Sequence, residues 1–158
     1  MAVCLHGAVR TTDDVDILVV TLDSPAVVLK SLRAAGYQPR YADPVAFAEV
    51  ARVLLVRHEQ TGIEVDVMLG MLPFDQECID RSVVKRGSFG TVRVASPEAL
   101  CVMKLVAGRP HDLRDVAQLI ELYPRMDRDW VMTYMTQYAE LMESPEALER
   151  AGEAFAAG

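Results

Sequence analysis

The feature that most constrains the fold is a stretch near the N-terminus, TTDDVDILVVTL, in which carboxylates precede and enter an apolar run. The run Val15–Leu22 is rich in β-branched residues and predicts a strand. Because side chains alternate across a strand, Asp14 and Asp16 share one face, and Val15 and Ile17 lie on the other. The strand therefore has an apolar face for a core and a second face that brings two acids together.

Carboxylates placed this close need a neutralising partner. At about 4 Å two of them repel by roughly 4 kcal/mol at an effective dielectric of about 20, so the pair requires water or a cation. A second predicted strand, Ile63–Leu69, carries Asp66 between two valines, with Glu64 on the same face. A site with two or three carboxylate ligands, and with coordination positions left for water or substrate phosphate, suits Mg²⁺. Alternatively, acids at a strand start serve as turn residues, and an acid within a strand faces solvent at a sheet edge.

Cap and turn residues divide the first half of the chain. Ser24 and Pro25 predict a helix start and Gly36 its end, which gives a helix of about three turns. The strands Arg52–His58 and Ile63–Leu69, separated by EQTG, predict a hairpin.

The second half of the chain is mostly helical in pattern. We expect a helix from Pro73 to about Arg86, a strand over Thr91–Ala95, and then a helix that starts at SPE and two or three more. The order predicts an α+β fold, a small mixed sheet with helices packed on it and a C-terminal helical segment. We expect residues 1–95 to form the α/β core and residues 96–158 the helical part of one compact domain.

The composition of the chain indicates a globular protein and argues against DNA and membranes as general binding partners. A length of 158 residues with 51% hydrophobic residues supports a globular core, and the net charge of −7 gives no general attraction to DNA or anionic membranes. No apolar stretch approaches the ~20 residues of a membrane span. The scattered cysteines Cys4, Cys78 and Cys101 fit a reducing compartment, so we expect a cytoplasmic protein.

Other reactive motifs are missing from the sequence. His6, His58 and His111 lack the mutual spacing of a metal site, so we interpret each as a surface or packing residue. Neither G-x-S-x-G nor a Walker-type loop occurs, which leaves serine hydrolase and P-loop functions without support.

Three segments together resemble one known superfamily. HGAVRTTDDVDILV, IEVDVML and VASPEALCVMKLVAGRPHDLRDV resemble nucleotidyltransferases, and within them the minimal AbiEii-like group associated with toxin–antitoxin and abortive-infection systems. The family pattern is Arg-x-Thr-x-Asp-x-Asp, followed by a third acid on a later strand. Arg10, Thr12, Asp14 and Asp16 match its central element, and Asp66 matches the third acid.

A later arrangement of the family, Lys-x₄-Arg-x₂-Asp-x₂-Asp, is matched by Lys104, Arg109, Asp112 and Asp115. The resemblance makes Lys104 and Arg109 candidates for phosphate contact. GRPHDLRD is also typical of a helix start with N-terminal charge, which favours a structural role for Arg109 and the two acids.

The resemblance implies an Mg²⁺-dependent transfer of a nucleotidyl group from a nucleoside triphosphate to an unknown acceptor, such as tRNA or a protein. In it Asp14, Asp16 and Asp66 are the catalytic metal ligands, and Asp66 also helps to activate the acceptor hydroxyl. Arg10 and Thr12 would contact phosphate with Lys104 and Arg109. An antitoxin or a second copy of the chain would be the protein partner. The alternative is a degenerate, inactive member that binds a regulatory partner.

One part of the family pattern has no match in this chain. The Gly-Gly or Gly-Ser turn that cradles the triphosphate would stand immediately before Met1, and Gly7-Ala8 is too close to Asp14 to replace it. We expect that the chain starts inside the ancestral domain, through a late assigned start codon or through genuine loss. With Met1 as the native start, nucleotide affinity should be poor.

Overall fold

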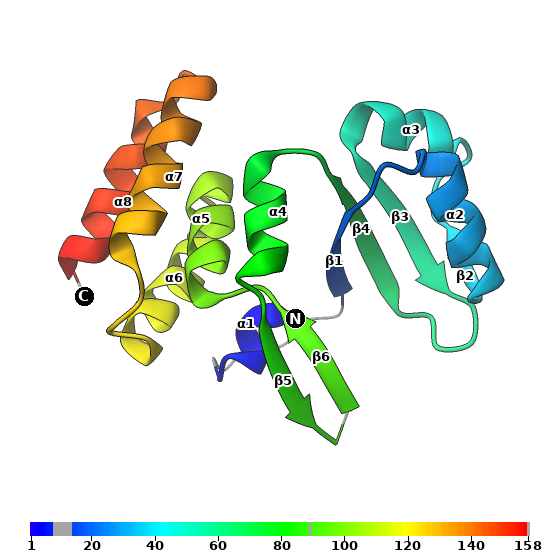
Figure 1. Ribbon diagram of the computed structural model, residues 1–158, viewed down its shortest axis with the longest axis horizontal. Helices are drawn as coiled ribbons and strands as arrows, with labels where there is room; N and C mark the ends of the chain where they lie inside the picture. The colour runs from blue at the N-terminus through cyan, green and yellow to red at the C-terminus, as the bar shows by residue number, and fades with distance from the viewer. Residues whose placement is uncertain (8–13, 89, 158) are drawn as a thin grey trace. The chain divides into compact units, whose positions relative to one another are not determined.

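The computed structural model describes residues 1–7, 14–88 and 90–157, and its class is α+β, as predicted (Figure 1). The chain divides into two units. A sheet unit consists of Met1 and residues 11–80, and a helical unit consists of residues 2–10 and 81–158.

The sheet unit contains a four-stranded mixed sheet with the order β1-β4-β3-β2. Strand β1 is parallel to β4, and the other neighbouring pairs are antiparallel. The strands are β1 (Asp14–Val20), β2 (Tyr37–Pro39), β3 (Val53–His58) and β4 (Glu64–Gly70). The predicted hairpin is confirmed as β3 and β4, and β1 and β2 form the two edges of the sheet.

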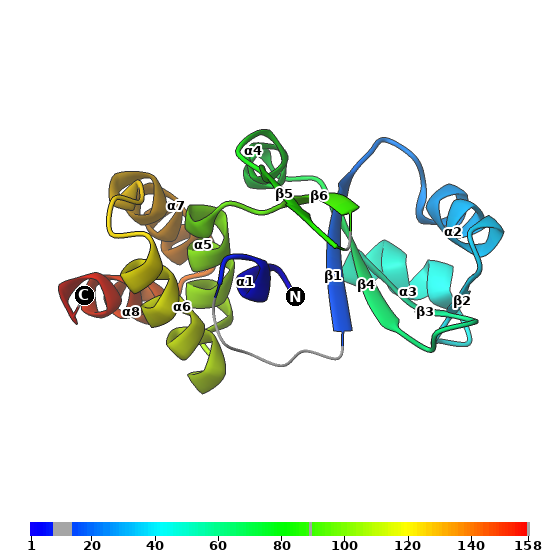
Figure 2. The same cartoon turned by 90° about the horizontal axis from the view of Figure 1, so that it is seen from below.

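One face of this sheet is apolar and packs against α2 (Pro25–Ala34) and α3 (Pro44–Ala51) (Figure 2). The buried side chains of this core are Leu29, Ala48, Leu54, Val56, Val65, Val67 and Leu69. Alternation along β4 places Val65 and Val67 in the core, and it places Glu64 and Asp66 on the opposite face of the sheet. The acidic face predicted from the sequence is therefore the face that α2 and α3 do not cover.

The end of β4 is fixed by a close contact with α4 (Pro73–Asp80). The carboxylate of Asp75 accepts hydrogen bonds from the backbone N–H groups of Met71 and Leu72, both at 2.8 Å. A Cβ atom on Gly70 would lie 2.7 Å from Cβ of Asp75, so glycine is required at this position. Helix α4 ends at Asp80, earlier than the sequence predicted, because a β-hairpin follows it.

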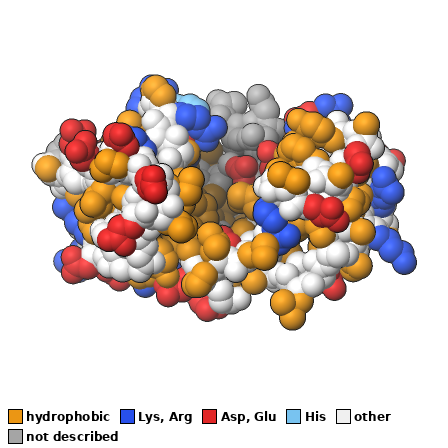
Figure 3. Space-filling model, turned by 90° about the horizontal axis from the view of Figure 1, so that it is seen from above, with side chains coloured by type: hydrophobic (Ala, Val, Ile, Leu, Met, Phe, Trp, Pro, Cys, Tyr) orange, Lys and Arg blue, Asp and Glu red, His pale blue; other side chains and the backbone are white. Residues whose placement is uncertain are grey.

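The helical unit contains that hairpin and five helices among its described residues. Its elements are α1 (Ala2–Leu5), β5 (Val83–Gly87), β6 (Gly90–Val94), α5 (Pro97–Ala107), α6 (Pro110–Leu122), α7 (Arg128–Leu141) and α8 (Pro145–Ala157). The predicted Ser-Pro-Glu start is confirmed, since the hydroxyl of Ser96 accepts a hydrogen bond from Ala99 N at 3.2 Å. On the face seen in Figure 3, hydrophobic and charged side chains are interspersed over this unit.

His6 connects the N-terminal segment to the rest of the helical unit through two hydrogen bonds. Its Nε2 donates to the carbonyl of Ala95 at 2.9 Å, which leaves Nδ1 of the neutral ring to accept from the Tyr123 hydroxyl at 2.8 Å. Burial lowers the pKa of His6 below its usual value. These contacts join the segment that contains α1 to residues of the helical unit. The division of the chain falls at residue 80, whereas we expected the helical part to begin at residue 96.

Two other predictions concern membrane insertion and the state of the cysteines. None of the described helices has the length and apolar character needed to cross a bilayer. Burial raises the pKa of both Cys78 and Cys101 to about 12, so these two thiols stay protonated and unreactive at neutral pH.

Candidate acidic site on the sheet

Strands β1 and β4 place acids in adjacent positions. In their parallel register Asp16 is the partner of Asp66, and Asp14 is the partner of Glu64. Register partners on parallel strands point to the same side of a sheet and their backbones are about 4.8 Å apart. Asp16 is exposed, and the side chain of Asp66 is 32% exposed. The structure thus places Asp16 and Asp66 in register on adjacent strands, on the side of the sheet that α2 and α3 do not cover, and the metal role of the two acids stays a prediction.

Two arginines, which the sequence analysis did not identify, form ion pairs with two of the acids on this face. Arg40 directly follows β2, and its backbone N–H donates to the carbonyl of Leu55 at 2.9 Å, which continues the pairing with β3. Its guanidinium bridges two acids, with Nη1 on Glu64 Oε2 and Nη2 on Asp66 Oδ1. Arg57 on β3 binds the other oxygen of Glu64. We call Arg40, Arg57, Glu64 and Asp66 the sheet cluster.

The arginines of the sheet cluster lower the pKa of Glu64. The hydrogen bond from Arg57, together with the charge of Arg40, lowers the pKa of Glu64 against the opposing effect of burial. Glu64 is therefore ionised at neutral pH and accepts hydrogen bonds with both of its oxygens.

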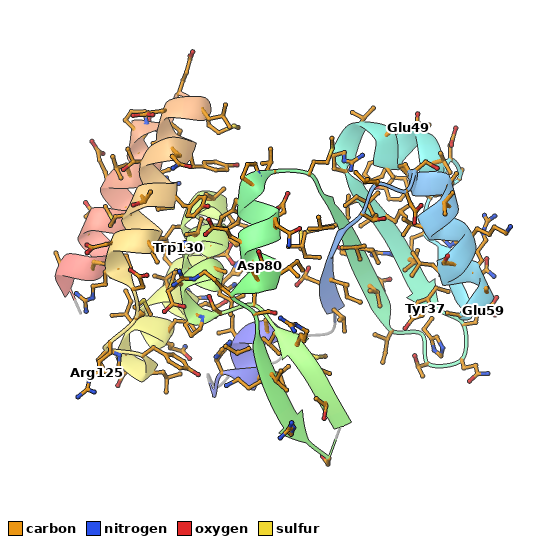
Figure 4. All side chains as sticks on the ribbon, in the orientation of Figure 1. Tyr37, Glu49, Glu59, Asp80, Arg125 and Trp130 are labelled. Carbon is orange, nitrogen blue, oxygen red and sulfur yellow. The ribbon has the colours of Figure 1, made fainter. Side chains whose placement is uncertain are left out.

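A shallow hollow adjoins the cluster on the β2 side. Its lining includes Gln38, Pro39, Arg40 and Arg57. Gln38 is held by a hydrogen bond of 2.7 Å to Glu59, which lies with Tyr37 at the same end of the sheet (Figure 4). Nε of Arg40 is buried and has no hydrogen-bond partner among the described residues. The guanidinium thus borders a hollow, and one of its donors has no acceptor in the described part of the chain.

The donor set can be compared with the needs of Mg²⁺. This ion binds oxygen ligands and is usually held by one or two carboxylates, with water and substrate phosphate completing the shell. Asp16 and Asp66 supply two such carboxylates side by side, and Asp66 already binds a cation, the guanidinium of Arg40. In the described part of the chain no three His, Cys, Asp or Glu side chains are grouped to hold a metal. Among the described side chains, Asp16 and Asp66 are therefore the two that would hold the ion, and Asp66 would have to exchange Arg40 for it.

The remaining residues of the predicted site fall into two groups. Arg10 and Thr12 lie outside the described residues, and Asp14 is placed by the pairing of its backbone with Glu64. The metal and phosphate roles of these three residues stay predictions.

Lys104 and Arg109 lie in the helical unit, in a second group of charges. Nζ of Lys104 contacts Asp112 at 3.0 Å and Asp115 at 2.6 Å, and Nε of Arg109 donates to Asp112 at 2.6 Å. The two carboxylates are buried. Burial alone would raise the pKa of Asp112, but the hydrogen bonds and charges of Arg109 and Lys104 outweigh it and lower that pKa. We call Lys104, Arg109, Asp112 and Asp115 the helical cluster.

The helical cluster joins the end of α5 to the start of α6. This geometry gives Asp112 and Asp115 the structural role that the sequence favoured. The phosphate role predicted for Lys104 and Arg109 is untested by these contacts, although Lys104 already binds two acids and the side chain of Arg109 is 64% exposed.

Comparison with known proteins bears on the fold. The sequence matches no protein-family model, and no curated protein matches it. The structure is similar to the crystal structure of an antigenic nucleotidyltransferase-like protein from Paracoccidioides brasiliensis, with a TM-score of 0.50 and 15% sequence identity over 94% of this chain and 81% of that chain. The fold is nucleotidyltransferase-like. At this identity the similarity concerns the fold alone, and the AbiEii-like grouping stays a prediction from the sequence.

Proposed function

We propose that the protein is an Mg²⁺-dependent nucleotidyltransferase that transfers the nucleotidyl group of a nucleoside triphosphate to an acceptor hydroxyl and releases pyrophosphate. The observation that carries the proposal is the register of Asp16 with Asp66 on the open face of a nucleotidyltransferase-like sheet. Two adjacent carboxylates on neighbouring strands are costly without a cation, and this arrangement supplies the hard oxygen ligands that Mg²⁺ prefers.

Each acid has a distinct task in this proposal. Mg²⁺, when bound, would offset the charge of the nucleotide phosphates during transfer. Asp16, with Asp14 two positions before it in the sequence, would hold the ion from the edge strand β1. Asp66, on the inner strand β4, would complete the site and accept the proton of the acceptor hydroxyl. Arg10 and Thr12 are the proposed phosphate contacts, and for Lys104 and Arg109 that role rests on the sequence resemblance alone.

The biological setting that we propose is an AbiEii-like toxin–antitoxin system in the cytoplasm. It rests on the resemblance of the sequence motifs. In that setting the acceptor would be tRNA or a protein, and an antitoxin or a second copy of the chain would be the partner.

A second candidate is an inactive member that binds a regulatory partner. One observation favours it: Glu64 and Asp66 already form ion pairs with Arg40 and Arg57, so these two acids have protein partners and do not need a metal to balance their charge. The two candidates differ in one measurable result. A catalytic protein transfers label from a nucleotide to an acceptor, and an inactive binding protein does not.

The test is incorporation of label from each α-³²P nucleoside triphosphate into total RNA and into total protein, with and without Mg²⁺. We expect transfer that requires Mg²⁺ and is lost in Asp16→Asn. The matched control is Asp23→Asn, which removes the same charge from an exposed position beyond β1. Label that is absent from every acceptor with the unaltered chain, or equal in the two variants, would contradict the catalytic proposal.

A further inference from the structure

We propose that Arg40 is a built-in counter-ion of the acidic site, which a divalent metal must displace from Asp66 in order to bind. The inference rests on the proposed function, because it concerns the same acids. It assigns a role to a residue outside the sequence motifs of the site, and it makes metal affinity depend on the competition between a guanidinium and an ion.

The guanidinium of Arg40 lies at the proposed metal site. Arg40 contacts Asp66, which is the register partner of Asp16. The carboxylate that is proposed to bind Mg²⁺ is thus already shared with a monovalent cation. A carboxylate oxygen that accepts a hydrogen bond from a guanidinium is less available to a metal, so the two cations compete.

The cluster can release Arg40 without leaving Glu64 unpaired. Glu64 uses Oε2 for Arg40 and Oε1 for Arg57. When Asp66 turns to a metal, Glu64 keeps both arginines or retains Arg57 alone. No buried charge is orphaned in either case, since the side chains of Glu64 and Asp66 are 35% and 32% exposed. An exchange of partners at this exposure costs little.

The guanidinium has a place to go. The hollow beside the cluster includes Gln38, Pro39 and Arg57 in its lining, together with Arg40 itself. The buried Nε of Arg40 lacks a hydrogen-bond partner among the described residues, so the present position does not satisfy this side chain fully. A shift toward the hollow opens the Asp16–Asp66 pair and brings this Nε closer to water.

The test measures the dissociation constant of the protein for Mn²⁺, which substitutes for Mg²⁺. Electron paramagnetic resonance gives the concentration of free Mn²⁺ in each titration. The variants are Arg40→Gln, Arg40→Lys and Arg57→Gln, with Arg33→Gln on the exposed side of α2 as a charge-matched control. Circular dichroism checks that each variant is folded. We expect the dissociation constant to fall about fivefold in Arg40→Gln, the scale of a half-exposed ion pair.

The other variants separate displacement from simple repulsion. Arg57 is a neighbouring charge that touches Glu64, so Arg57→Gln should change the dissociation constant by less than about twofold. Arg40→Lys keeps the charge but cannot bridge two carboxylates, and it should bind Mn²⁺ with intermediate affinity. Arg33→Gln should bind as the unaltered chain does.

Three results would overturn the inference. Equal gains in Arg40→Gln and Arg57→Gln would mean that general charge, and not displacement, sets the affinity. Unchanged or weaker binding in Arg40→Gln, with the unaltered chain binding Mn²⁺, would remove the inference and leave the proposed function intact. Absence of Mn²⁺ binding in the unaltered chain and in every variant would overturn the proposed function as well.

Discussion

The sheet unit and the helical unit each contain a cluster of two basic and two acidic side chains, and the clusters differ in their exposure to water. In the sheet cluster the side chains of Glu64 and Asp66 are 35% and 32% exposed. In the helical cluster those of Asp112 and Asp115 are 2% and 6% exposed. The same charges thus occupy two different dielectric environments.

This difference determines what each cluster can do. A buried carboxylate that loses its cation leaves an uncompensated charge, which is strongly unfavourable. The ion pairs of Lys104 on α5 with Asp112 and Asp115 on α6 therefore stabilise the contact between the two helices. A half-exposed carboxylate can exchange partners because water solvates it during the exchange. The helical cluster is therefore suited to hold the fold together, and the sheet cluster is suited to bind an exogenous cation.

The largest effect that we expect is on the helical cluster. Lys104→Met removes the cation that two buried carboxylates share, and it should lower the free energy of unfolding by about 3–5 kcal/mol. Trp130, the single tryptophan, lies on α7 of the helical unit (Figure 4), so its fluorescence during urea denaturation reports on this unit. Arg114→Met, at an exposed position of α6, is the control and should cost less than about 0.5 kcal/mol. Similar losses in both variants would contradict the contrast between the clusters.

A smaller effect is expected from the corresponding change in the sheet cluster. Arg40→Gln removes a partly exposed ion pair, so the free energy of unfolding should fall by about 1 kcal/mol or less in metal-free buffer. Urea denaturation followed by far-ultraviolet circular dichroism measures this change. A loss as large as that of Lys104→Met would show that Arg40 is a structural residue and not an exchangeable counter-ion.

The pH dependence of the helical unit gives a third test, independent of both clusters. Because the pKa of His6 is lowered in the folded state, the unfolded chain takes up the proton first as the pH falls. Stability should therefore decline as the pH drops below about 6.5 toward the folded-state pKa, with a slope of at most about 1.4 kcal/mol per pH unit. Trp130 fluorescence in urea at pH 7.5, 6.5 and 5.5 measures it, and His6→Gln should flatten the slope. An equal slope in the variant would assign the pH dependence to another group.

The smallest effect is that of salt. Raising the ionic strength from about 0.1 M to 1 M shortens the Debye length from about 10 Å to 3 Å, which weakens exposed ion pairs more than buried ones. The coupling between Arg40 and Asp66, measured by a double-mutant cycle of Arg40→Gln and Asp66→Asn, should shrink by roughly half or more. A parallel cycle of Lys104→Met and Asp115→Asn should change less. An equal salt dependence of the two coupling energies would contradict the proposal that exposure to water distinguishes the two clusters.

Local patterns in the sequence were sufficient to predict the elements that carry the acids. β-branched residues with alternating acids identified β1 and β4, and the EQTG turn identified the β3–β4 hairpin. Helix α3 was missed, although Asp43 before Pro44 is a start signal and the Asp43 carboxylate accepts from Ala46 N at 3.1 Å. The segment Val83–Gly87 was assigned to a helix, but its two valines and the nearby glycines favour the β5–β6 hairpin.

The part of the site that could not be predicted depends on contacts between distant segments. Arg40 reaches Glu64 and Asp66 across 24 and 26 positions of the chain, because the short strand β2 pairs with β3 at the far edge of the sheet. No local period or motif marks this pairing. The sequence therefore predicted the acids and their common face, and it gave no signal for the cation that neutralises them.

The most direct test of the central claim is a crystal structure of the chain grown with Mn²⁺, in which anomalous scattering locates the ion. We predict a manganese peak bounded by the carboxylates of Asp16 and Asp66, with the Arg40 guanidinium withdrawn from Asp66 toward the hollow. A manganese peak elsewhere, or none while Arg40 still bridges Glu64 and Asp66, would contradict the assignment of this face as a metal site.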